Sequence, residues 1–87
     1  MLIEVNGMKY TKYFEFTKLR ADRSEIKEEW IAKAFFEPAF ELVQNDGRIR
    51  RWAKISDADN KYLRIVILED NETIHNAFFD RSFKEKL

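Results

Sequence analysis

The chain has no cysteine, one proline, two glycines and one histidine among its 87 residues. Without cysteine there is neither a disulfide framework nor a thiolate metal site, and this composition fits a reducing cytoplasm. No apolar run approaches the roughly 20 residues that span a bilayer. The N-terminus also lacks the basic and apolar regions of a secretory signal. We therefore expect a cytoplasmic protein with no membrane partner.

The formal net charge is zero, because sixteen Lys and Arg residues balance sixteen Asp and Glu residues. This balance argues against a dedicated nucleic-acid-binding protein of high pI. The charges are nevertheless segregated along the chain. All charged residues from Arg48 to Lys54 are basic, whereas acidic residues outnumber basic ones from Asp22 to Glu41. This distribution predicts one electropositive patch on an otherwise acidic surface.

Aromatic side chains are abundant, with eight Phe, three Tyr and two Trp. A domain of this size buries only roughly 60% of its unfolded surface, so these rings must supply much of the core. We expect a single domain over residues 1–87. Its core would span about residues 12–84, with residues 1–10 as a loosely held lead-in.

The first half of the chain predicts one strand and one helix. Alternating aromatic and polar residues predict a strand over residues 12–18. A helix would then start at a capping box formed by Asp22 and Glu25, with Ser24 as a competing N-cap, and would end before Pro38. The apolar stripe of this helix would consist of Ile26, Trp30, Ile31, Ala34 and Phe35.

Tight turns divide the second half into strands. Asn45-Asp46-Gly47 predicts a hairpin turn, and strands separated by tight turns pair antiparallel. The expected strands cover residues 40–44, 48–55, 61–70 (the central strand) and 73–83, followed by a solvated tail at 84–87. The predicted fold class is α+β and two-layered: one main helix packs on an antiparallel sheet of three to four strands, in the order strand, helix, strand, strand, strand.

The strand from residue 48 to residue 55 should have two different faces. One face carries Ile49, Arg51, Ala53 and Ile55, and should pack against the helix. The other face is cationic around one indole ring, a combination that suits phosphates and an unpaired base. A charged edge strand with its tryptophan packed under arginine stems has the same pattern. The cationic face consists of Arg48, Arg50, Trp52 and Lys54.

Two further residues are candidates for chemistry. His75, which shares strand parity with Ala77 and Phe79, has an ordinary pKa of about 6.5 that suits proton transfer, although a structural role is the alternative. Arg64 lies in the apolar central strand, so it must pair with a carboxylate or face a polar site. The sequence has no glycine-rich phosphate loop, no metal-ligand spacing and no nucleophile elbow, so we expect neither metal nor cofactor.

The segments "DGRIRRW", "YLR" and "HNAFFDR" resemble a group of short bacterial proteins, many of them cyanobacterial. This resemblance covers about residues 13–84. More remotely, the size, element order and basic strand residues are similar to those of RelE/BrnT-type toxins of type II toxin–antitoxin systems. The resemblance implies a metal-independent endoribonuclease, held inactive by an antitoxin protein, that activates a ribose 2′-hydroxyl against the neighbouring phosphate.

On this resemblance, His75 would transfer protons, Arg64 and Arg50 would bind the phosphate, and Arg81 would be a second cation. RNA binding would fall to Arg48, Trp52 and Lys54. These roles require His75, Arg64 and Arg50 to leave the same face of the sheet. Two alternatives remain open: a non-catalytic module that binds RNA or a protein, and a homodimer that buries its open sheet face.

Overall fold

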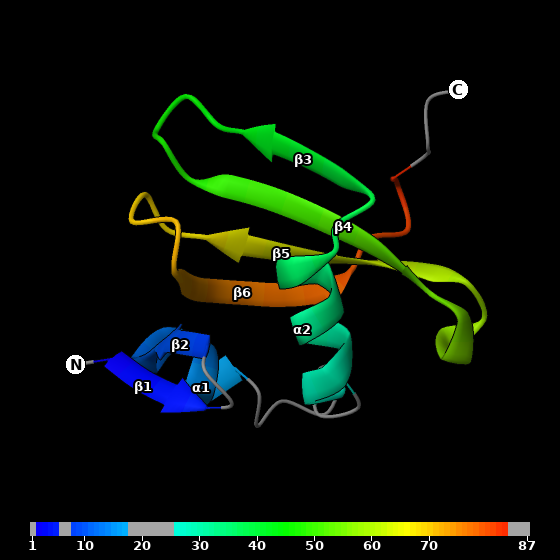
Figure 1. The fold of residues 1–87 in the computed structure, drawn as a ribbon, viewed down its shortest axis with the longest axis horizontal. Helices are drawn as coiled ribbons and strands as arrows, with labels where there is room; N and C mark the ends of the chain where they lie inside the picture. The colour runs from blue at the N-terminus through cyan, green and yellow to red at the C-terminus, as the bar shows by residue number, and fades with distance from the viewer. Residues whose placement is uncertain (1, 6–7, 18–25, 84–87) are drawn as a thin grey trace.

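The computed structural model describes residues 2–5, 8–17 and 26–83. It has an α+β fold in which one helix lies across a single sheet (Figure 1). The strands are β1 (Leu2–Val5), β2 (Met8–Thr11), β3 (Phe40–Val43), β4 (Ile49–Ile55), β5 (Lys61–Ile67) and β6 (Thr73–Phe79). The helices are α1 (Lys12–Thr17), α2 (Glu28–Phe36) and a short 3-10 helix, η1 (Ser56–Ala58). No described helix is long and apolar enough to cross a membrane.

The sheet has six strands in the order β1-β2-β6-β5-β4-β3. All neighbours pair antiparallel except β2 and β6, which are parallel. The α+β class is confirmed, whereas the prediction of three to four strands, all antiparallel, is wrong. The difference arises at the N-terminus, because β2 pairs with a strand more than sixty residues away through Lys9 and Thr73. Local sequence patterns carry no signal of such a pairing.

The segment from residue 8 to residue 17 differs most from its prediction. Residues 12–17, the described part of the strand expected over residues 12–18, form helix α1 instead, and the strand lies just before it as β2. Thr11 ends β2 and caps α1, because its Oγ1 accepts a hydrogen bond of 3.1 Å from the Phe14 backbone N–H. Met8 and Tyr10 are buried in the core, so the prediction of a loosely held lead-in is wrong for this segment. Tyr10 also donates a 2.7 Å hydrogen bond to Glu28 of α2.

Helix α2 confirms the predicted apolar stripe from Trp30 to Phe35, but it begins at Glu28 with Lys27 as its N-cap, so the predicted helix start is wrong and Ile26 precedes the helix. Ile31 and Ala34 are fully buried, and the remaining stripe residues pack against the core. The helix ends at Phe36, and Glu37 has already left helical geometry, with φ −135°, immediately before Pro38. The predicted capping residues Asp22, Ser24 and Glu25 lie outside the described residues, as does the tail expected at 84–87.

The predicted hairpin is also confirmed. β3 and β4 pair antiparallel around Gly47, whose φ of 90° lies in the region that favours glycine. Strand β5 lies centrally, between β4 and β6, and Leu63, Ile65 and Ile67 have no exposed surface. The helix-facing side of β4 is as expected. Its one charged member, Arg51, donates hydrogen bonds to the Phe35 carbonyl (2.7 Å) and to Glu41 (2.9 Å).

Candidate functional site

The candidate residues lie mainly on the side of the sheet opposite α2, which we call the open face. Register places Arg50 beside Val66 and Asn76 in one row across β4, β5 and β6. The next row contains Trp52, Arg64 and Phe78. Two clusters on this face behave differently. The Trp52 end consists of Trp52, Arg64, Phe78, Asp80 and Phe83; the His75 end consists of Thr11, Tyr13, Arg48, Arg50 and His75.

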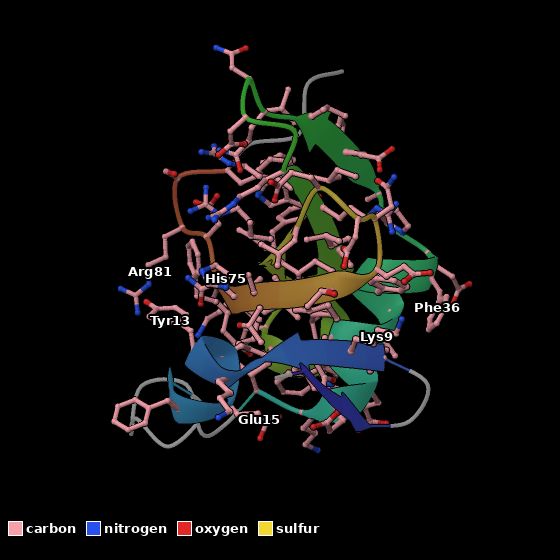
Figure 2. All side chains as sticks on the ribbon, turned by 90° about the vertical axis from the view of Figure 1, so that its left-hand side faces the viewer. Lys9, Tyr13, Glu15, Phe36, His75 and Arg81 are labelled. Atoms are coloured by element: carbon pink, nitrogen blue, oxygen red, sulfur yellow. The ribbon has the colours of Figure 1, made fainter. Side chains whose placement is uncertain are left out.

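A β-bulge places His75 on the open face. Val66 and Ile67 are consecutive in β5, but their partners in β6 are Asn76 and Ile74, which leaves His75 as an extra residue. Ile74 and Ala77 are both buried in the core, so His75 leaves the sheet on the same side as Asn76. Figure 2 shows His75 and Tyr13 on one side of the molecule and Phe36 of α2 on the other. Simple strand parity with Ala77 would have placed His75 against the helix.

The His75 ring is held by two residues of the preceding N-terminal segment. Its Nδ1 lies 3.0 Å from Thr11 Oγ1, across 64 positions of sequence. Tyr13 stacks on the imidazole, with ring centroids 4.8 Å apart and an interplanar angle of 25°. Among the described residues, none hydrogen-bonds to Nε2. The ring is therefore oriented through one nitrogen, while the other has no partner in the part of the chain that the structure describes.

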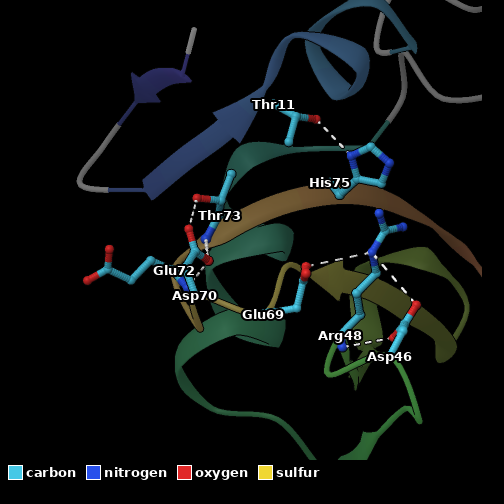
Figure 3. A network of polar contacts seen from close by, with 8 residues as sticks. All are labelled: Thr11, Asp46, Arg48, Glu69, Asp70, Glu72, Thr73 and His75. Carbon is cyan, nitrogen blue, oxygen red and sulfur yellow. Dashed lines mark hydrogen bonds and ion pairs between the residues drawn. The ribbon is translucent and has the colours of Figure 1, made fainter.

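Burial lowers the pKa of His75, and the positive charge of Arg48 lowers it further. Figure 3 shows the two side chains next to each other at the end of the sheet. The histidine is therefore mainly neutral at pH 7, the protonation state that a general base needs. Arg48 itself has only long ion pairs, with its Nε 3.9 Å from both Asp46 and Glu69. No carboxylate of the described residues lies within ion-pair distance of Arg50.

Trp52 is not an exposed ring, so the prediction that it stacks on a base is wrong. Only 6% of its surface is exposed. Phe83, in the turn after β6, stacks on the indole at a centroid distance of 4.7 Å. The indole Nε1 donates a 3.1 Å hydrogen bond to Asp80. The alternative is right in that the tryptophan is packed, but an aromatic ring rather than arginine stems covers it, and β4 is not an edge strand because it lies between β3 and β5.

Arg64 takes the first of its two predicted alternatives and pairs with a carboxylate. Its Nη1 lies 3.5 Å from Asp80 Oδ2, and its guanidinium lies 4.2 Å from the Phe78 ring centroid. Burial lowers the pKa of Arg64, Asp80 opposes that change, and Arg50 adds to it. Its Nε is buried without a hydrogen-bond partner. The contacts of Arg64 are therefore with residues of the Trp52 end of the face.

Asp80 joins the two candidate residues of the Trp52 end. Burial would raise its pKa, but hydrogen bonds from Ser82 and Trp52, together with the Arg64 charge, lower the pKa below its ordinary value. Its other oxygen accepts hydrogen bonds from the Ser82 backbone and hydroxyl. One carboxylate thus orients an indole and an arginine and also fixes the turn that carries Phe83.

The remaining predicted residues lie away from His75. Arg81 is exposed in the turn beyond the far end of β6. Phe79, the last residue of β6, is already four positions along the strand from His75, a distance of roughly 13 Å. Lys54 is exposed two positions beyond Trp52, in the direction away from Arg50. The structure therefore groups His75 with Arg48, places Arg50 in the row of Asn76, and separates Arg81 and Lys54 from them.

Sequence reasoning missed Thr11 and Tyr13. Both belong to the segment whose strand and helix were wrongly assigned, and both reach His75 only through the parallel pairing of β2 with β6. Only the N-cap preference of Thr11 is visible in the sequence. Within the described residues, no group of three or more His, Asp or Glu side chains is placed to hold a metal ion.

Comparison with known proteins does not assign the chain to a family. Neither a family model, nor a curated protein, nor a solved structure matches the chain. The resemblance to toxin proteins drawn from the sequence segments therefore stays a prediction.

Proposed function

We propose that the open face binds RNA and that its His75 end cleaves the bound strand without a metal ion, as a toxin-like endoribonuclease. One observation carries the proposal. A neutral imidazole is held at Nδ1 by Thr11 and stacked on Tyr13, next to Arg48, and its Nε2 has no partner among the described residues. An oriented base beside a cation is the arrangement that proton transfer next to a phosphate requires.

In this mechanism His75 Nε2 takes the proton of a ribose 2′-hydroxyl. The 2′-oxygen attacks the adjacent phosphorus, the bond to the 5′-oxygen breaks, and that oxygen takes a proton from solvent water as it leaves. The products are a 2′,3′-cyclic phosphate and a 5′-hydroxyl end. Arg48 and Arg50 would stabilise the charge on the phosphate oxygens. Arg64 would act only through its longer-range field, because Asp80 already pairs with it.

The toxin part of the proposal, including an antitoxin that covers the cationic face, depends on the sequence resemblance alone. A second candidate is a non-catalytic module that binds a protein or a second copy of itself. The edge strand β3 favours this alternative, because Leu42 and Val43 are 51% and 62% exposed. An exposed edge strand presents unpaired backbone groups to a partner strand.

The test is cleavage of single-stranded RNA by the purified protein in EDTA, with and without ribosomes. We compare wild type, His75→Ala, Arg50→Ala and the control Lys33→Gln, which changes an exposed cation of α2. We expect His75→Ala to lower the rate by about 10²–10⁴-fold, Arg50→Ala to lower it less, and Lys33→Gln to have no effect. Intact RNA under both conditions, or equal rates for wild type and His75→Ala, would favour the binding module.

A further inference from the structure

Helix α1 has two exposed aromatic rings, and one of them, Tyr13, stacks on His75. Tyr13 is 50% exposed and Phe16 is 73% exposed. Residues three positions apart lie on neighbouring parts of one helix surface. Neither ring supplies the core contact of the helix, because Phe14 does so and is 2% exposed. Packing of the described core therefore does not explain these two aromatic residues.

Tyr13 is stacked on another ring and is nevertheless half exposed. The stacked face lies against His75, at a centroid distance of 4.8 Å. Half of Tyr13 is exposed, and among the described residues no ring other than His75 stacks on the phenol. A flat ring fixed in this way has lost most of its freedom before a ligand arrives, which reduces the entropic cost of binding.

The cationic face needs an aromatic partner that Trp52 cannot be. Phe83 covers the indole, and Asp80 binds its Nε1. At the His75 end, an accessible ring and two arginines without short ion pairs occur together. Cations for the backbone and a ring for a base are the two components of single-strand binding.

We propose that Tyr13 is the base-stacking residue of this site: an unpaired RNA base lies on the outer face of its ring, with the adjacent phosphate at Arg48. The assignment rests on the proposed function, because the phosphate to be cleaved must lie at His75. Stacking on a phenol ring tolerates any base but requires one that is not paired. Tyr13 therefore selects single strands over duplexes and positions the scissile linkage.

Binding without cleavage tests the assignment. The probe is a short fluorescent 2′-O-methyl oligonucleotide, which has no free 2′-hydroxyl, and the readout is anisotropy. We expect Tyr13→Ala to weaken binding about tenfold and Tyr13→Phe to keep it within about twofold. Phe36→Ala is the matched control, since that ring is 63% exposed on the other side of the sheet, and should bind like wild type. Thermal unfolding of each variant identifies any loss that comes from instability.

The outcomes separate this inference from the proposed function. Equal affinities of wild type and Tyr13→Ala, or preference for the matching duplex, overturn the stacking role even if wild type cleaves RNA. A Tyr13-dependent affinity with no cleavage supports the stacking role and removes the catalytic one. Where cleavage does occur, Tyr13→Ala should raise KM and should also lower kcat, because Tyr13 holds the His75 ring; an unchanged KM counts against stacking.

Discussion

The Trp52 end and the His75 end of the open face contain the same kinds of residue, arginines beside an aromatic ring, yet their environments differ. At the Trp52 end, Asp80 pairs with Arg64 and accepts a hydrogen bond from Trp52, and Phe83 covers the indole. Among the described residues, the His75 end has no equivalent of Asp80 at short range, since the ion pairs of Arg48 are 3.9 Å long. The comparison shows that one carboxylate and one covering ring bury the tryptophan at the Trp52 end, whereas Tyr13 at the His75 end stays half exposed.

The largest expected difference between the two ends is in the stability cost of removing a ring. Trp52→Ala should lower the free energy of unfolding by about 3–5 kcal/mol, because it leaves a cavity beneath Phe83. Tyr13→Ala should cost about 1 kcal/mol or less, because half of that side chain is already exposed. Urea denaturation measures both. Similar costs would mean that the two rings are equally buried in solution, contrary to this comparison.

The second largest difference is expected in the stability cost of removing a carboxylate from each end. Asp80→Ala should cost about 2 kcal/mol, since it leaves Arg64 and the Trp52 Nε1 without their partner. Glu69→Ala, the control at the His75 end, should change stability by less than about 0.5 kcal/mol. Because the folded-state pKa of Asp80 is lowered, its contribution is present above the ordinary carboxyl pKa and is lost as pH falls through the folded value. A stability difference that stays constant with acidification would contradict this role.

A smaller stability effect is expected at Thr11. Thr11→Val removes both the cap of α1 and the hydrogen bond to His75, and should cost about 1 kcal/mol. Thr11→Ser retains a hydroxyl and is the matched control, with a smaller loss. Thermal unfolding measures the stability, and NMR of the single histidine reports whether its ring stays oriented. If valine is tolerated as well as serine, the hydroxyl has no positioning role.

The smallest effect concerns the protonation of His75. Arg48→Gln removes a positive charge that lowers the pKa of His75, so this pKa should rise. Burial is the larger cause and remains, so the rise should stop short of the ordinary value. An NMR titration of the only histidine measures it directly, with Lys54→Gln as a control that should leave it unchanged. The acid limb of any cleavage activity should move to higher pH with Arg48→Gln, because His75 must be neutral to act as a base.

The lowered pKa of His75 also makes the stability of the wild-type protein depend on pH. Because the folded-state pKa of His75 is lowered, the unfolded chain binds more protons between that value and about 6.5. The stability associated with neutral His75 is therefore complete above about pH 6.5 and falls as the pH drops toward the folded pKa. His75→Gln should reduce this dependence, and an unchanged pH profile would contradict the burial of the ring.

Several features of the fold followed from local sequence. The end of α2 at Pro38, the turn at Gly47 and the apolar stripe around Ile31 are local, because ring geometry, a positive φ and helical spacing act over a few residues. The two faces of β4 also followed from simple alternation. The segment from Tyr10 to Phe16 did not, because its aromatic spacing fits both a strand and a helix.

The sequence by itself therefore determined the α+β class, the central hairpin and strand β5, and the cationic side of β4. Only the tertiary structure decided which candidates meet. His75 faces Arg48 because Ile74 and Ala77 both pack in the core and force a bulge between them. Trp52 is covered because the turn held by Asp80 brings Phe83 over it. Both outcomes depend on contacts between segments far apart in the chain, which residue spacing along one strand does not contain.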